Sequence, residues 1–305
     1  MTALRIFRSA CTHALASPPL VLTLYGVNLL LAFPALYFSR FVLTAALGNS
    51  LAGESLLAGF DYTVWFDLLS PRNLSLGTLL QFAVPMAILG IALYTFLAGG
   101  VLDLLAREKR FSAASFFRAC GTYLGRFLAI WILTTIVLLL VIALFGTFLG
   151  VVVGIVNAQS DSEQATGITI IVSLIVFSFP IFLIFMASDY ARVYTVVQGG
   201  HSSWKALGRG FQFVLRNTGS TLGLHLLLLL LLGIAVALYL VLEGLVAIDR
   251  PGTIVLVFLL QQLFMVGRAA IRVAFSAGEV ALYEERKPRP VIFYGWDDSP
   301  PRREP

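Results

Sequence analysis

The sequence predicts an all-α polytopic membrane protein with six transmembrane helices, and three observations support this fold class. Apolar residues make up 59% of the 305-residue chain and charged residues only 12%, which is too little polar surface to cover a soluble core of this size. Several apolar stretches reach the length of about 18 residues or more that marks a membrane-spanning helix. Lysine and arginine are concentrated in alternate segments between these stretches, as they are in multi-pass membrane proteins.

Six apolar stretches account for most of the chain, and we expect each of them to form a transmembrane helix. Each is longer than the roughly 20 residues that a helix needs to cross the hydrocarbon core. The predicted spans are 19–41, 78–104, 128–156, 168–190, 219–243 and 253–285.

The distribution of basic residues predicts how these spans are oriented. Segments 1–18, 105–127, 191–218 and 285–305 hold sixteen lysines and arginines, and the other three connections hold at most three. Because basic loops stay on the cytoplasmic side, we expect a multi-pass membrane protein with both termini in the cytoplasm. The net charge of +5 then reflects membrane orientation and attraction to anionic lipid, and it gives no reason to expect a nucleic acid partner.

A basic amphipathic pattern precedes three of the spans. In "SFFRACGTYLGRF" (115–127) the apolar residues recur every three or four positions, which places them on one face of a helix. The same pattern recurs in "HSSWKALGRGFQFVLRN" (201–217) and in "ALRIFRSACTHAL" (3–15). The three apolar stripes are Phe116, Cys120, Tyr123 and Phe127; Trp204, Leu207, Phe211 and Val214; and Leu4, Phe7 and Cys11.

These amphipathic segments are expected to lie in the membrane interface, with their apolar faces in the acyl boundary and their cations at the headgroups. The cations assigned to this interface are Arg118, Arg126, Lys205, Arg209 and Arg216. The chain therefore divides into three repeated units, each consisting of an interfacial helix and a hairpin of two spans, at about 1–105, 106–198 and 199–285. Together they form a single six-span domain over 1–287, followed by a largely disordered cytoplasmic tail over 288–305.

The glycine and arginine spacing around "GG" (99–100) and "FRACGTYLGRF" (117–127) resembles a group of bacterial six-span proteins. This group includes the membrane domain attached to some glycerophosphodiester phosphodiesterases, and most of its members have unknown function. The resemblance covers residues 3–287. It implies the fold and a location in a bacterial inner membrane. It implies no activity, because the chain has no counterpart of the phosphodiesterase catalytic domain.

Charged residues inside or at the ends of the spans are the candidates for a binding site, since such residues are costly in a membrane. Arg268 and Arg272 lie one helical turn apart in the last span, and Glu279 follows on roughly the same side. We call the second span of each hairpin its return span, and the last span is the return span of the third unit. The return spans of the first two units supply Asp103 and Asp189, and we expect these acids to face the two arginines. Two alternatives remain open: a buried ion-pair lock that fixes helix packing, or a polar cavity for an anionic headgroup or substrate.

The sequence carries no motif of a nucleotide-binding loop, a zinc protease or a serine hydrolase. Its histidines (His13, His201 and His225) are widely separated, and we expect His225 to be a packed histidine in a leucine-rich span. We therefore predict no catalytic residues, no metal site and no cofactor, and we expect that the protein is not an enzyme.

Two functional classes remain. The first is a protein without catalytic activity that organises membrane lipid, in particular anionic lipid, or a membrane-protein partner through its basic cytoplasmic face. The second is a transporter or lipid-handling permease with a polar site at the cytoplasmic end of the bundle. A cavity beside the charged residues would favour the second class.

Overall fold

The computed structural model describes residues 2–48, 62–63, 66, 76–108, 110–159, 162–200, 202–246 and 250–287. Its helices are α1 (Thr2–Leu15), α2 (Pro18–Leu47), α5 (Leu76–Ala106), α6 (Ala113–Gln159), α7 (Glu163–Gln198), α8 (Ser203–Arg216), α9 (Thr218–Gly244) and α10 (Pro251–Arg286). Over these ranges the ordered elements are helices, which confirms the predicted all-α fold class. The predicted tail at 288–305 lies outside the described residues.

Six of these helices are long and apolar enough to cross a membrane, so the chain is a multi-pass membrane protein. They are α2, α5, α6, α7, α9 and α10, and each contains one of the predicted spans. Local signals set several of their ends. Pro18 begins α2, where the missing N–H of proline is tolerated, and Gly199 ends α7 in the left-handed conformation with φ 67°.

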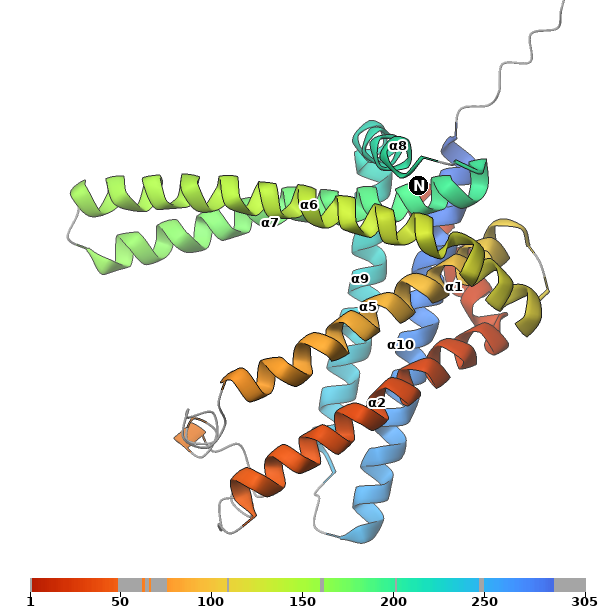
Figure 1. The fold of residues 1–305 in the computed structure, drawn as a ribbon, viewed down its shortest axis with the longest axis horizontal. Helices are drawn as coiled ribbons and strands as arrows, with labels where there is room; N and C mark the ends of the chain where they lie inside the picture. The colour runs from red at the N-terminus through yellow and green to blue at the C-terminus, as the bar shows by residue number, and fades with distance from the viewer. Residues whose placement is uncertain are drawn as a thin grey trace, which may run out of the picture.

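The six long helices form three antiparallel hairpins, α2–α5, α6–α7 and α9–α10, which diverge from one end of the molecule (Figure 1). An aromatic pair joins the two helices of each hairpin: Phe38–Phe82, Phe145–Phe177 and Tyr239–Phe264 have ring centroids 3.8, 3.7 and 4.7 Å apart. Beyond these pairs, the diverging parts carry mostly exposed apolar side chains, such as Leu140, Leu144 and Phe148 of α6. A lipid environment suits such surfaces.

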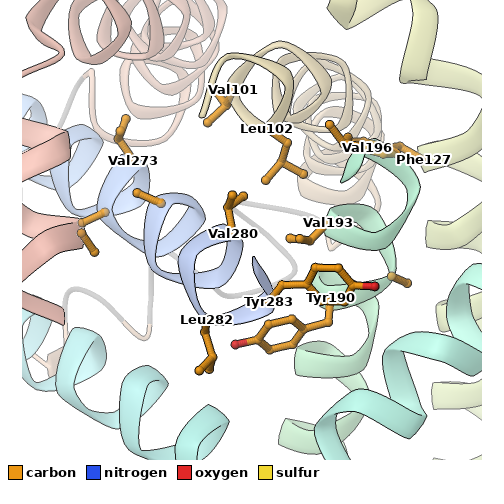
Figure 2. Packing of buried hydrophobic residues seen from close by; sticks show 14 of the residues in the cluster. Val101, Leu102, Phe127, Tyr190, Val193, Val196, Val273, Val280, Leu282 and Tyr283 are labelled. Atoms are coloured by element: carbon orange, nitrogen blue, oxygen red, sulfur yellow. The ribbon is translucent and has the colours of Figure 1, made fainter. Parts of the chain in front are cut away.

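The buried core lies where the hairpins converge, and we call this region the junction. The second helices of the hairpins, α5, α7 and α10, contact one another there. Their buried side chains include Val101 and Leu102 of α5, Tyr190 and Val193 of α7, and Val280 of α10 (Figure 2). In α6 and α7 the buried residues are confined to one part of each long helix, Phe116–Thr134 and Ile184–Val196. The junction is therefore the packed centre of the protein.

The amphipathic segments close the junction in a cyclic order. The start of α6 packs on α5, α8 packs on α7, and α1 packs on α10. The amphipathic segment of each unit thus packs on the second hairpin helix, or return helix, of the preceding unit. For the first unit, the segment α1 packs on α10, the return helix of the last unit.

Two features of the predicted amphipathic segments are wrong. The segment at 113–127 is not a separate interfacial helix, because α6 runs without a break from Ala113 to Gln159. The apolar faces also pack largely against protein: Phe116, Cys120, Tyr123 and Phe127 are buried, and so are Leu207 and Val214 of α8. The physical reason is that the return helices offer small residues, such as Gly99 and Gly100, against which these faces fit closely.

The predicted register of α1 is also wrong. Its buried side chains are Ile6, Ala10 and Ala14, whereas Leu4 of the predicted stripe is 55% exposed. The small alanines allow α1 to approach α10 closely, and an ideal Cβ on Gly278 of α10 would lie 3.5 Å from the Ala10 Cβ. The buried face therefore combines an apolar side chain, Ile6, with small residues that allow close helix approach.

Candidate functional site

A polar cavity lies inside the junction, beside charged residues of α7 and α10. Its volume is about 230 Å³, and its polar lining consists of Asp189 and Arg192 of α7 and Arg272, Ser276 and Glu279 of α10. Apolar side chains of α2 and α5, including Leu24 and Leu97, form the opposite wall. At about 30 Å³ per water molecule, a cavity of this size has room for several waters or for one phosphate-sized group.

Arg192 reaches the cavity from α7 and is only partly neutralised. Its Nη1 lies 3.3 Å from Asp189 Oδ1, and its Nη2 donates to Ser188 Oγ at 3.3 Å. Ser188 Oγ in turn accepts from Thr134 Oγ1 of α6 at 3.1 Å. The Nε of Arg192 is buried and has no hydrogen-bond partner in the described part of the chain.

Arg272 is held by an aromatic ring. Its guanidinium carbon lies 4.0 Å from the centre of the Tyr94 ring on α5, a cation–π contact that favours the charged side chain without using its N–H donors. The Tyr94 hydroxyl donates to Asn28 of α2, which fixes the ring. The Tyr94 contact therefore leaves the donors of Arg272 available beside the cavity.

Glu279 lines the cavity and also contacts a histidine. Its Oε1 lies 3.4 Å from Nε2 of His225 on α9, and both side chains are almost completely buried. The His225 ring is enclosed by Phe182 and Phe275, with ring centroids 6.0 and 5.9 Å away. Asp189, His225 and Glu279 each contribute a ligand-type atom, and these atoms all lie within 4.8 Å of one another.

The structure brings Asp189, Arg272 and Glu279 together and leaves the other two predicted site residues outside the cavity lining. Arg268 is exposed on α10, one turn before Arg272. Asp103 pairs with Arg107 Nε at 2.8 Å and accepts from the Tyr123 hydroxyl at 3.5 Å. The hydrogen bond to Tyr123 and the negative charge of Asp103 raise the pKa of Arg107 above its ordinary value. The predicted pairing of Asp103 with the two arginines is therefore not found.

The repeat explains the displacement of Asp103. Asp189 lies in "ASDY" (187–190), and Glu279 lies in "AGEV" (277–280), 90 positions later. The matching stretch of α5 is "AGGV" (98–101), which has Gly100 at the acidic position, one turn before Asp103. An ideal Cβ on Gly100 would lie 2.6 Å from Cys120 Sγ and 2.7 Å from two carbons of the Phe116 ring. Close packing against α6 therefore excludes a side chain there.

The residues assigned to a basic interface lie on the outside of the junction. Arg118 at the start of α6 and Lys205, Arg209 and Arg216 of α8 are exposed, and Arg126 is half-buried. On α8 the exposed Trp204 and Leu215 accompany them. This surface remains free for contact with lipid or a partner after the buried faces of both helices have packed on protein.

Three site residues were missed in the sequence. His225 was interpreted as a packed histidine, and Arg192 and Tyr94 were not considered. The available signal for Arg192 was its spacing of three from Asp189, which places both on one helix face. His225 lies on α9, the hairpin partner of α10, but the sequence does not show which α10 residues it contacts. Nothing in the sequence indicates that Tyr94, on another hairpin, meets Arg272.

Comparison of the chain with protein families, with curated proteins and with solved structures found no match. The resemblance to the phosphodiesterase-linked membrane domain stays a prediction.

Proposed function

We propose that the protein binds an anionic oxygen group, of the phosphate type, in the junction cavity, and that it acts as a lipid-handling protein or permease without catalytic activity. One observation carries this proposal: two arginines, Arg192 and Arg272, line the same cavity of about 230 Å³. Arginine guanidinium groups are well suited to phosphate because they present several N–H donors in a fixed plane. An ion-pair lock alone would have no need for this enclosed space.

We propose that the protein resides in a bacterial inner membrane with the junction on the cytoplasmic side. The segments that hold sixteen of its lysines and arginines join helices at this end or follow α10. The cavity would then lie at the depth of the inner-leaflet headgroups. Apolar side chains such as Leu24 and Leu97 in its wall suit a group attached to an acyl chain.

The basic outer surface favours a second function, the organisation of anionic lipid or of a membrane-protein partner. Arg118, Lys205 and Arg209 are exposed there, and each basic residue near an anionic surface contributes about 1 kcal/mol of attraction. The two functions can coexist, because one uses the inside of the junction and the other its outside.

The cavity proposal can be tested by replacing each of two neighbouring arginines on α10. We would purify the wild type, Arg272→Gln and Arg268→Gln in polymer nanodiscs and identify the retained lipids by mass spectrometry. Arg268 is the matched control, since it carries the same charge one turn away but lies outside the cavity lining. We expect retained phospholipid in the wild type and Arg268→Gln, and occupancy at least about tenfold lower in Arg272→Gln.

Competition by glycerol phosphate distinguishes the two sources of the phosphate. Displacement of the retained lipid would indicate a site open to soluble phosphate esters, and no displacement would indicate a lipid headgroup site. Equal retention by folded Arg272→Gln and Arg268→Gln would overturn the cavity proposal. A stoichiometric protein partner in the same samples would support the organising function instead.

A further inference from the structure

Asp189, His225 and Glu279 form a compact cluster beside the cavity. They come from three helices, α7, α9 and α10, and their ligand-type atoms all lie within 4.8 Å of one another. His225 and Glu279 are 5% and 7% exposed. Asp189 is partly exposed and paired with Arg192, whereas Glu279 is a carboxylate inside the apolar bundle, which is costly unless positive charge or a hydrogen bond compensates it.

The orientation of His225 determines what can fill the cluster. Its Nδ1 lies 3.1 Å from the backbone oxygen of Thr221. A carbonyl oxygen only accepts hydrogen bonds, so Nδ1 carries the proton and Nε2 of the neutral ring presents a lone pair. That Nε2 is buried without a hydrogen-bond partner in the described residues and lies 3.4 Å from Glu279 Oε1.

A lone pair facing two carboxylates is repulsive unless a proton or a metal cation lies between them. A charge-assisted hydrogen bond would bring the nitrogen and oxygen to about 2.7–2.9 Å, which is shorter than the observed 3.4 Å. Two ligands placed about 2.1 Å from a tetrahedral zinc ion, by contrast, are about 3.4 Å apart. The spacing therefore matches two neighbouring ligands of one metal ion better than a shared proton.

The supporting contacts also have the form found around bound metals. Ligating histidines usually donate their second ring N–H to a carbonyl or carboxylate, which fixes the tautomer, and the Thr221 oxygen has this role for His225. Asp189 contacts Arg192 through Oδ1 at 3.3 Å, and a carboxylate has a second oxygen for another partner. Arg192 thus orients Asp189 at the edge of the cluster.

We propose that Asp189, His225 and Glu279 bind one divalent transition-metal ion that accepts mixed nitrogen and oxygen ligands, such as Zn²⁺. Imidazole and carboxylate together suit this class of ion. The metal ties α7, α9 and α10 together at the junction and compensates the buried carboxylate of Glu279. Asp189 and Glu279 also line the cavity, whereas His225 does not, so the metal and the phosphate-type group can be tested separately.

The experiment is a Zn²⁺ titration of full-length protein that is free of a polyhistidine tag, in nanodiscs, after removal of metal with a chelator. We expect one saturable equivalent by calorimetry in the wild type and visible absorption bands on loading with Co²⁺. His225→Gln and Glu279→Gln should each weaken Zn²⁺ binding by more than about tenfold. His13→Gln is the matched control, because His13 is an exposed histidine of α1 outside the cluster.

Failure of the wild type to bind one saturable equivalent would overturn the metal proposal and leave His225 and Glu279 as a proton-sharing pair. Equal affinity of folded His225→Gln and His13→Gln would do the same. If His225→Gln does not fold, the wild-type titration and Glu279→Gln still decide the question. Arg272→Gln should keep its metal while losing the retained phospholipid, and His225→Gln should show the reverse, so each proposal can fail alone.

Discussion

Gly210 marks the closest contact between α8 and α7. An ideal Cβ at this position would lie 2.2 Å from the backbone oxygen of Ala187 and 2.9 Å from the backbone nitrogen of Ala191. Backbone atoms inside a helix cannot move aside as the end of a flexible side chain can. A side chain at position 210 must therefore push the two helices apart, and Ala187 lies directly before the network that holds Arg192.

We expect Gly210→Ala to destabilise the protein by about 1–3 kcal/mol, the usual cost of overpacking a close contact. Gly208 on the same helix is exposed and has nothing within 4 Å of its ideal Cβ. Gly208→Ala should therefore be neutral or stabilising by up to about 1 kcal/mol, because alanine favours helix over glycine. Thermal unfolding in detergent measures both, and equal unfolding temperatures would contradict the predicted contact.

At the residue level, the sequence indicated the kinds of site residue better than their partners. Charged residues in spans are unusual enough to identify Asp189, Arg272 and Glu279 as candidates. Their partners depend on which helices meet, and that information is absent from a single span. Asp103 illustrates the limit, since one helical turn separates it from the position that matches Asp189, and packing against Phe116 places glycine there.

At the level of the helices, apolar length predicted all six spans, because about 20 apolar residues in a helix have few alternatives to a membrane. What covers an amphipathic face was not predictable. An apolar stripe has the same periodicity whether it faces acyl chains or another helix. In α1 the spacing of Leu4, Phe7 and Cys11 fits one helix face as well as the spacing of the buried Ile6, Ala10 and Ala14 fits another, so periodicity selected the wrong register.

The orientation of α8 gives a direct test of the proposed topology. We expect Lys205→Cys to resist a membrane-impermeant maleimide in spheroplasts and to react in inverted vesicles, because basic segments remain in the cytoplasm. Glu163→Cys, at the exposed start of α7, should show the opposite pattern and serves as the control. Labelling of Lys205→Cys in intact spheroplasts would contradict a cytoplasmic junction.

The native cysteines should contribute little to this assay. Cys120 is fully buried. Burial raises the pKa of the Cys11 thiol, which lowers the fraction of reactive thiolate at neutral pH. Wild-type protein labelled in parallel gives the background.

At the level of the whole molecule, the cyclic order of the units makes the first helix part of the last unit's packing. The sequence repeat predicted three similar units but not how they associate. Each amphipathic segment could have packed within its own unit, and the periodicity would be unchanged. In the structure each segment packs instead on the return helix of the preceding unit. This arrangement holds α5, α7 and α10 together around one cavity, whose polar side chains come from α7 and α10.

The contact between α1 and α10, which completes the cyclic order of the units, can be tested by a disulfide between these two helices. An ideal Cβ on Gly278 lies 3.5 Å from the Ala10 Cβ, within the roughly 3.5–4.5 Å that a disulfide requires. The nearest obstacle is the end of the flexible Leu224 side chain at 3.2 Å, which can shift. We expect Ala10→Cys/Gly278→Cys, in a Cys11→Ser background, to form the cross-link on mild oxidation, as detected by linked peptides in mass spectrometry.

The cross-link should also raise the unfolding temperature in a reductant-sensitive way, since a disulfide typically stabilises by about 2–4 kcal/mol. Leu4→Cys/Gly278→Cys is the matched control on the same two helices. Leu4 is exposed and lies about 9 Å along α1 from Ala10 at 1.5 Å per residue. If both pairs cross-link equally, α1 does not hold a fixed position on α10. A cross-link confined to the Ala10 pair means that the first helix of the chain completes the junction, so that loss of α1 would open the packing around Glu279 from the outside.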